Sequence, residues 1–454
     1  MREVRNMKKR WKKVLCFTTA AAMALTAAGC GGGSSEEKKE DTKTTASQEE
    51  SQDKSQEKEE KVQLTVWSLY GTNPDDKSAV AFQESIKEIM EEDPTLDIQL
   101  DYAENEAYKT KIKAAVAANE APDIYGTWGG GFTKPFVEAD KVLQIDEYMT
   151  EDIKGQLLPG VLDYFTFDDK LYGLPTKMST CHLFINKKIM EENNVEIPTT
   201  YSELLEACKT LRENGVTPIS LGAKDRWAIG KVFDMMGVRA CGIENVTKIL
   251  SGESTFTDPD FENAAKKFEE MSKAGAFTEN AVAISNDEAL ADFTLGKAAM
   301  FYNGSWSCGF INGESSTVKD DVITIPFPVM EDGKGTVNEY VGGASDGFVI
   351  NKETKYPEKA FEVLQKISYK MSLKSYQASL DMPVWDVKDQ VDESKIDPLF
   401  KTIAEDAQNA TGYIAWWDTF FEGSAAQDYL YALIDLSMGD ISAEEFCEKM
   451  DTLN

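Results

Sequence analysis

Strand patterns and helical patterns alternate over the first part of the folded chain. Residues 62–67 (VQLTVW) and 98–102 have the composition and alternation of strands, and residues 123–125 form a third short apolar run. Amphipathic helical patterns over residues 79–91 and 106–118 separate these strands. Strand, helix, strand, helix, strand is typical of a parallel sheet with helices on its faces. The sequence therefore predicts an α/β fold.

Helix signals extend the same class of fold towards the C-terminus. Thr200 is followed by Glu203, and the same Ser/Thr-x-x-Glu pattern, which caps a helix N-terminus, recurs at Ser442. Helical patterns over residues 261–274 and 358–371 predict two further helices. The chain has 454 residues, which is too long for one compact sheet, so we expect two α/β bodies.

The first 29 residues have the pattern of a signal peptide. Residues 2–13 are basic, residues 14–28 are apolar and rich in alanine, and this run is too short to span a bilayer as a permanent helix. Small residues stand directly before Cys30, as in the bacterial lipoprotein signals that this segment resembles. That resemblance implies that Cys30 receives a lipid and becomes the mature N-terminus. An ordinary cleaved signal peptide is the alternative, and either interpretation predicts export.

The segment that follows has a composition that does not fold. Residues 31–61 contain no aromatic side chain and almost no aliphatic one, so they bury too little apolar surface to form a core. We interpret residues 30–61 as a lipidated cysteine and a solvated tether to a body that starts near Val62. A lipid anchor with a tether would hold the protein at the outer face of the cell membrane without a transmembrane span.

The charge of the chain argues against two classes of partner. The net charge is −31, and loss of residues 1–29, with seven basic and one acidic side chain, changes it to −37. Nucleic acids and acidic membrane surfaces repel such a chain. We therefore expect no nucleic-acid partner, and contact with the membrane only through the lipid.

Seven cysteines are spread along the chain without a CxxC pair, so neither a zinc knuckle nor a thioredoxin-like motif is available. Cys16 would leave with the signal peptide, and Cys30 would carry the lipid. We expect the others to be buried small apolar residues. Their pairing stays open for Cys181, Cys208, Cys241, Cys308 and Cys447.

The usual motifs of catalysis are absent from the sequence. His182 is the single histidine, so a Ser-His-Asp or Cys-His arrangement would have to be built on it, and a lone histidine is more often structural. There is no HExxH, no GxxxxGK[ST], no GxGxxG after a strand and no EF-hand spacing. A pair of glycosidase carboxylates stays possible because acidic residues are abundant. We expect no enzyme and no cofactor, and we predict no metal-ligating residues, while the binding of a metal ion stays open.

Tryptophans follow short strands at glycine-rich turns. Residues 298–302 are apolar and aromatic, as in a buried strand, and Asn303-Gly304-Ser305 is a turn signal that would leave Trp306 at the strand end. An earlier short strand runs into Trp128 and then into residues 129–131, which are all glycine and would let a ligand approach the backbone closely. Strand ends of an open α/β sheet face a crevice. The pattern favours ligand contact for both tryptophans over a place in the core.

Five motifs, in order, resemble the extracellular solute-binding proteins of family 1. They are APDIY with a following Trp, YGLP, FINKK, PTTYSELLEACKTL and F-x-x-G-K-A-A-M-x-x-N-G-S-W. That family comprises the maltose-binding-protein-like sugar-binding lipoproteins of ABC importers. The resemblance implies a bilobed periplasmic-binding-protein-like fold, with two α/β lobes joined by a three-crossover hinge and the ligand between them. The implied N-terminal lobe is 62–173 plus 344–378, and the C-terminal lobe is 174–343 plus 379–454.

The resemblance also implies which residues hold a sugar. Trp128 falls in the first-lobe loop where relatives contact sugar with a Trp and nearby polar groups. Trp306 matches the position where relatives stack a Trp on the apolar face of a sugar. One of Trp416 and Trp417 resembles a C-terminal aromatic contact. For the weaker matches, packing or local hydrogen bonding stays the alternative. The ligand-binding residues predicted in this way are Trp128, Trp306, Trp227, Trp416, Trp417, Tyr70, Asn73, Gly129, Ser179, Asp225 and Gly343.

Together these features predict a monomeric, lipid-anchored receptor that captures an oligosaccharide and hands it to an ABC permease without chemistry. Closure of the lobes would present a surface that the permease distinguishes from the empty form. The alternatives are a non-sugar solute such as a peptide, polyamine or glycerol phosphate, an exported glycoside-active enzyme, and an adhesin without transport. Turns that carry Trp, Gly, Asn and Ser favour a neutral sugar, and several Trp residues favour more than one ring. The sugar, its linkage and its chain length stay open.

Overall fold

The structure is a computed structural model that describes residues 61–421 and 424–453. The residues in these two ranges belong to one compact unit. The predicted signal peptide, Cys30 and nearly all of the predicted tether lie outside the described residues. Within the described ranges, no helix is both long and apolar enough to cross a membrane.

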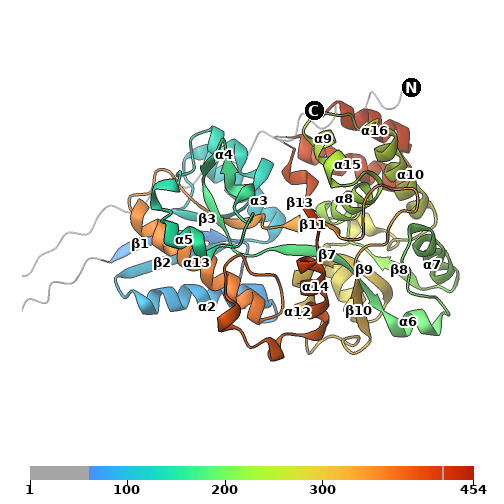
Figure 1. The fold of residues 1–454 in the computed structure, drawn as a ribbon, viewed down its shortest axis with the longest axis horizontal. Helices are drawn as coiled ribbons and strands as arrows, with labels where there is room; N and C mark the ends of the chain where they lie inside the picture. Colours follow the sequence, from blue (N-terminus) through green and yellow to red (C-terminus); the bar gives the residue numbers. More distant parts are fainter. Residues whose placement is uncertain (1–60, 422–423, 454) are drawn as a thin grey trace, which may run out of the picture. The chain divides into compact units, whose positions relative to one another are not determined.

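Five strands form the first sheet, whose order is β2 (Leu96–Tyr102), β1 (Val62–Ser68), β3 (Ile124–Trp128), β12 (Asp346–Ile350) and β6 (Gly173–Pro175) (Figure 1). The predicted alternation builds the parallel part, in which β1 pairs with β2 and with β3. The strand β12 then pairs antiparallel with β3 and β6, so the sheet is mixed. We call the body built on this sheet the first lobe.

The longer helices pack on the first lobe's core because each has one apolar face. In α2 (Lys77–Glu92), Phe82, Ile86 and Ile89 are buried, as the amphipathic pattern predicts. The other helices of this lobe are α3 (Asn105–Ala118), α4 (Lys134–Glu138), α5 (Glu151–Gln156) and α13 (Pro357–Gln377), and a small hairpin joins β4 (Thr166–Phe167) to β5 (Lys170–Leu171).

Six strands form the second sheet, which contains β13 (Gly412–Ile414), β11 (Glu339–Gly343), β7 (Ser179–Asn186), β9 (Ala298–Gly304) and β8 (Thr217–Ser220) in this order, with β10 (Val322–Ile325) paired to β7 (Figure 1). All residues of β7 and β9 are buried. Leu183 and Ile185 of β7 belong to one core cluster and Phe184 to another, because side chains alternate across a strand. We call this body the second lobe.

The helices of the second lobe lie on both faces of its sheet. On one side α8 contacts β11, α10 and α15, while on the other α11 contacts β9 and α14 contacts β7. The capping boxes predicted for α7 and α16 are both present. These helices are α6 (Lys187–Glu192), α7 (Tyr201–Glu213), α8 (Trp227–Cys241), α9 (Ile243–Leu250), α10 (Pro259–Lys273), α11 (Asn286–Thr294), α12 (Cys308–Ile311), α14 (Pro398–Gln408), α15 (Ala425–Met438) and α16 (Ala443–Asp451).

The chain passes between the two sheets three times. It leaves the first sheet after β6, returns between β11 and β12, and leaves again after α13 on its way to β13. At the first two passages β11 pairs antiparallel with β7, with Gly343 opposite Ser179. Strands therefore lie at the junction of the lobes, where the backbone runs from one sheet into the other.

The single histidine and the five described cysteines are all buried away from solvent. His182 lies in β7, where its ring nitrogens are 2.9 Å from Thr180 Oγ1 and 3.1 Å from Asp406 Oδ2, and burial lowers its pKa. Its ring stacks on Tyr340. The cysteines, which carry free thiols, are Cys181, Cys208, Cys241, Cys308 and Cys447.

A buried guanidinium fixes the segment that leads into β11. Arg239 of α8 is fully buried, and it donates to the carbonyl oxygens of Phe327 (2.9 Å) and Glu339 (2.8 Å). It donates also to Thr336 O and Val337 O. Burial lowers its pKa to about 10, and main-chain carbonyls rather than a carboxylate surround it. The entry into the strand that returns to the first lobe therefore depends on one side chain.

We expect Arg239→Met to destabilise the protein by about 3–5 kcal/mol, because it leaves several buried carbonyls unpaired. The measurement is the urea-unfolding midpoint followed by circular dichroism. Lys248→Met, which removes an exposed ion pair with Glu244, is the control and should leave the midpoint unchanged. Equal midpoints for Arg239→Met and the unsubstituted protein would contradict the anchoring role.

Candidate functional site

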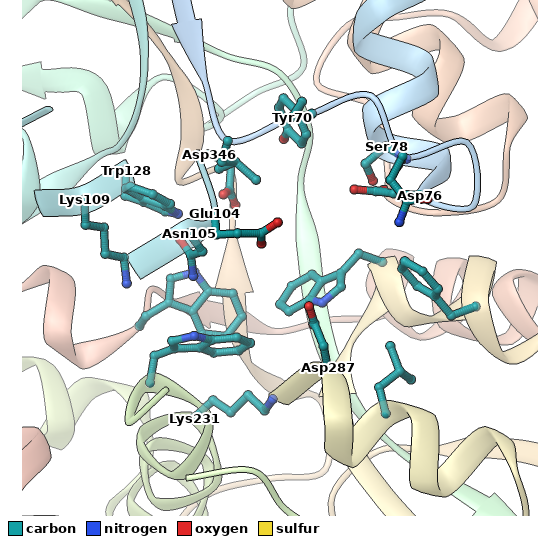
Figure 2. Close-up of a pocket in the computed structure, with 18 of the residues that line it drawn as sticks. Tyr70, Asp76, Ser78, Glu104, Asn105, Lys109, Trp128, Lys231, Asp287 and Asp346 are labelled. Carbon is teal, nitrogen blue, oxygen red and sulfur yellow. Dashed lines mark hydrogen bonds between the residues drawn. The ribbon is translucent and has the colours of Figure 1, made fainter. Parts of the chain in front are cut away.

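A cavity of about 870 Å³ lies between the first and second lobes and is lined by both. We call it the cleft. The first lobe contributes the segment after β1, the start of α3 and the end of β3, and the second contributes α8, α11 and the segment after β9. Figure 2 shows side chains of both lobes directed towards one another across this space, with Tyr70 and Asp346 on one side and Lys231 and Asp287 on the other.

Trp306 is placed by a glycine that leaves room for its ring. The strand β9 continues through Gly304, and a 3-10 turn over Ser305–Ser307 follows, so the turn predicted at residues 303–305 begins later than expected. A Cβ on Gly304 would lie 1.9 Å from the indole of Trp306. The ring therefore folds back over the strand end, and its place in the cleft requires glycine at this position.

Trp227 is the first residue of α8, and a lysine one turn later supports its ring. The ammonium of Lys231 lies 4.5 Å from the ring centroid, in cation–π geometry. Arg226 precedes the helix at φ 24°, a rare backbone conformation for a residue other than glycine. Its guanidinium donates to Gln427 Oε1 (2.9 Å) and lies over Tyr431 of α15. The start of α8, and Trp227 with it, is thus tied to α15.

Trp128 ends β3 and lies in a cluster of first-lobe aromatic rings. It packs edge-on against Tyr108 and Phe132, and the ammonium of Lys109 is 5.2 Å from its ring centroid. In the sheet register it stands opposite Asp346. Burial raises the pKa of the Asp346 carboxyl, although Lys177 and a hydrogen bond from Trp128 lower it in part.

The neighbours Trp416 and Trp417 have different positions. Trp416 lines the cleft and packs edge-on against Trp306, with ring centroids 5.9 Å apart. Trp417 is fully buried in the core, where its ring stacks on Phe261 and its backbone N–H donates to Asp234. Of this pair, only Trp416 has a face that a ligand in the cleft could reach.

The remaining predicted site residues divide into two groups. Tyr70 and Asn73 line the cleft, as do the tryptophans other than Trp417. Four others do not line it, and each has a local contact: Ser179 donates to Asp381, Asp225 accepts from the backbone of Asn286, and Gly129 and Gly343 make room for Tyr164 on two sides.

A buried ion pair lies beneath the cleft. The ammonium of Lys177, which lines the cleft, is 2.9 Å from the Asp381 carboxylate. The other oxygen of Asp381 accepts from the hydroxyls of Ser179 (2.7 Å) and Ser305 (2.6 Å). Burial alone would lower the pKa of Lys177, but Asp381, Tyr70 and Asp346 together raise it above its usual value.

Several charged residues of the cleft were not predicted from the sequence. Two of them could have been predicted from neighbouring residues, because Lys231 lies four residues after Trp227 on the same helix and Asp346 follows the predicted Gly-rich crossover. The others come from segments without a motif. Burial raises the pKa of Asp287 and of Asp418. The unpredicted charged residues of the cleft are Asp75, Asp76, Glu104, Lys109, Lys177, Lys231, Asp234, Asp287, Asp346 and Asp418.

The lobes also touch beside the cleft through main-chain atoms. A Cβ on Gly131 would lie 2.3 Å from Thr419 O, so this glycine allows the first lobe to contact the segment that follows Trp416. Close to this contact, the Tyr164 hydroxyl hydrogen-bonds to the main chain of Ala415. The glycine-rich turn after Trp128 therefore serves contact between the lobes, whereas the sequence suggested approach of a ligand.

The comparisons with known proteins agree with this architecture. A family model described as bacterial extracellular solute-binding protein matches residues 74–367. A structure from a study of xylan utilisation by the thermophilic bacterium Caldanaerobius polysaccharolyticus aligns with a TM-score of 0.82 at 39% identity, over 86% of this chain and 99% of that one. A chitin oligosaccharide binding protein aligns with a TM-score of 0.78 at 25% identity, over 87% and 98%. The predicted bilobed α/β fold is confirmed.

Sequence relatives have similar descriptions. The multiple sugar-binding protein of Streptococcus mutans is 22% identical over 332 residues, which are 71% of this chain and 74% of that protein. The chain spans 50% of the length of one ABC transporter extracellular-binding protein of Pyrococcus horikoshii and 64% of a second. These sequence relatives and the chitin oligosaccharide binding protein are binding proteins by description.

We expect Gly304→Ala to displace the indole of Trp306 from its place over the strand end, because the new methyl group occupies the same space. Gly304 has φ −73°, so the substitution strains no backbone, and stability should fall by only about 1–3 kcal/mol. The measurement is acrylamide quenching of tryptophan fluorescence, which should increase as the ring becomes exposed. Gly155→Ala is the control, since a Cβ there meets nothing within 4 Å. Unchanged quenching in Gly304→Ala would contradict this packing.

Proposed function

The chain belongs to the bacterial extracellular solute-binding protein family, and on that basis we propose that it captures an oligosaccharide in the cleft and delivers it to the permease of an ABC importer. The observation that supports this most is the convergence of four tryptophans on one cavity. They come from four separate segments of the two lobes, and all are half-buried: Trp128, Trp227, Trp306 and Trp416.

The chemistry of the cleft suits a sugar. An aromatic ring stacks on the apolar C–H face of a pyranose, while the hydroxyl rim needs polar partners. Carboxylates, amides and ammonium groups stand between the tryptophans, among them Asp287, Asn105 and Lys109. A cavity of about 870 Å³ is in the upper part of the range for small-molecule sites, which favours more than one sugar ring.

The descriptions of the relatives support an oligosaccharide as the ligand. One structural relative comes from work on xylan utilisation, another is a chitin oligosaccharide binding protein, and a sequence relative is a multiple sugar-binding protein. We therefore place fragments of xylan and chitin first among the sugars to be tested.

The other parts of the proposal extend beyond the cleft. The protein is exported, as its family is extracellular, and in our proposal a lipid on Cys30 anchors it to the outer face of the membrane. It acts as a monomer without catalysis, and its lobes consist of 62–173 plus 344–378 and of 174–343 plus 379–454. Closure of these lobes on the ligand signals occupancy to the permease.

A polyamine is the second candidate ligand, because one observation favours it. Seven carboxylates line the cleft, whereas its lysines number three, and a polycation needs such a wall of negative charge. The tryptophan platforms favour the sugar, since a polyamine gains less free energy than a sugar from placing C–H groups against an aromatic ring. The two ligands are readily separated by experiment.

The test is thermal unfolding with a panel of xylo-, chito- and malto-oligosaccharides, monosaccharides, polyamines and peptides. A ligand at about 100 times its Kd adds about 2.7 kcal/mol to the free energy of unfolding, which raises Tm by several degrees. We expect a shift with one class of oligosaccharide, which is recovered unchanged. A shift with polyamines or peptides alone would reject the sugar, and cleavage of the sugar would reject a binding protein without catalysis.

We expect Trp306→Ala and Trp227→Ala each to weaken oligosaccharide binding by about 10- to 100-fold, because each removes an apolar platform worth about 1.5–3 kcal/mol. The measurement is isothermal titration calorimetry with the sugar that the panel identifies, after Tm without ligand has shown that the variants fold. Tyr356→Ala removes an exposed ring that does not line the cleft, and its Kd should not change. Unchanged affinity in both tryptophan variants would contradict the stacking model.

A further inference from the structure

Lys231 is a buried lysine at the cleft that has amides rather than a carboxylate as its hydrogen-bond partners. Its side chain lies in α8 with 2% of its surface exposed, and it lines the cleft. The ammonium donates to Asn303 Oδ1 (2.7 Å) and to Asn286 Oδ1 (3.1 Å). Within the described ranges, no carboxylate lies within ion-pair distance of it. Figure 2 shows it beneath the aromatic rings of the cleft.

The hydrogen bonds of Lys231 leave one donor. An ammonium has three N–H groups and no acceptor, and the two amide oxygens take two of these groups. The third is left beside Trp227, whose ring centroid is 4.5 Å from the nitrogen. The ammonium covers one face of the indole, so a sugar held against Trp227 would reach this place with a hydroxyl that extends past the ring edge. The Lys231 Nζ atom therefore has one N–H group without an acceptor at a place that the proposed ligand can reach.

We propose that the Lys231 ammonium donates a hydrogen bond to a hydroxyl of the sugar held against Trp227, so that capture of the sugar takes up a proton. This inference rests on the proposed function. It adds a specificity-determining residue and a dependence on pH to the same site.

The loss of a proton removes the donor that the sugar needs. A neutral amine has two N–H groups, and Asn303 and Asn286 occupy both. The lone pair that remains can only accept. A hydrogen bond from an ammonium is about twice as strong as one between neutral groups. The protonated form therefore binds the sugar more tightly than the neutral form.

The groups around Lys231 place the loss of its proton in the neutral range of pH. Burial lowers the pKa of Lys231 to about 7, and Cys181 of β7, Asp225 before α8 and Asp287 of α11 offset the effect only in part. The Cys181 thiol has its own pKa raised to about 12 by burial, so it stays neutral. Phe301 of β9 adds an aromatic face at 5.7 Å. A sugar that favours the ammonium raises its pKa further, and binding weakens as the pH rises through 7.

Calorimetry on the unsubstituted protein tests the proton uptake directly. At pH 7.5, the heat of sugar binding in buffers of different ionisation enthalpy should reveal uptake of roughly half a proton, and Kd should be roughly ten-fold weaker at pH 8.5 than at pH 6.5. No uptake together with a constant Kd would overturn the inference and leave the proposed function intact. Absence of sugar binding at every pH would overturn both.

Substitutions assign the proton to Lys231. Lys231→Met should bind more weakly at pH 6.5 and lose both the proton uptake and the pH dependence. Lys231→Arg keeps a permanent charge, so its Kd should not vary with pH. Lys209→Met, on the exposed side of α7, is the matched control and should behave like the unsubstituted protein. A purely structural role for Lys231 would lower the affinity of Lys231→Met equally at all pH values and leave its proton uptake unchanged, which would overturn the inference.

Discussion

The buried ion pair between Lys177 and Asp381 connects the parts of the chain on which both the lobes and the cleft depend. Lys177 lies on the first passage between the sheets and Asp381 on the third. The same carboxylate accepts hydrogen bonds from Ser179 at the start of β7 and from Ser305 beside Trp306. Removing one charge from such a pair would leave the other buried and unpaired. The junction of the lobes and the floor of the cleft are therefore one structure.

The cleft combines rigid aromatic rings with a polar background that is only partly neutralised. Each tryptophan is seated by a neighbour, as Trp306 is by Gly304 and Trp227 is by Lys231. The carboxylates outnumber the lysines there, and burial raises the pKa of several of them. A ligand with many hydroxyls can donate to the carboxylates and accept from the lysines at once. This mixture explains how a strongly acidic protein can hold an uncharged ligand.

The sequence predicted the features that depend on neighbouring residues. Composition and alternation located β1 and β2, a short apolar run located β3, and turn signals placed Trp128 and Trp306 at strand ends. Contacts between distant residues were out of reach. Ser179 and Asp381 are 202 positions apart, so the hydroxyl assigned to a sugar belongs instead to the ion pair at the junction. Trp416 and Trp417 could not be separated either, since Trp416 precedes the 3-10 turn Trp417–Thr419 and Trp417 begins it, and this one step decides which ring enters the core.

The five buried thiols affect how long the protein stays intact outside the cell. Burial raises the pKa of each, and a thiol without its thiolate form hardly reacts. The native fold therefore protects these thiols against oxidation. Because the five cysteines are free, the fold can form without an oxidase. An unfolded molecule would expose five nucleophiles in oxidising surroundings and could cross-link before it refolds. For this exported protein, the lifetime is then governed by the rate of unfolding rather than by the equilibrium.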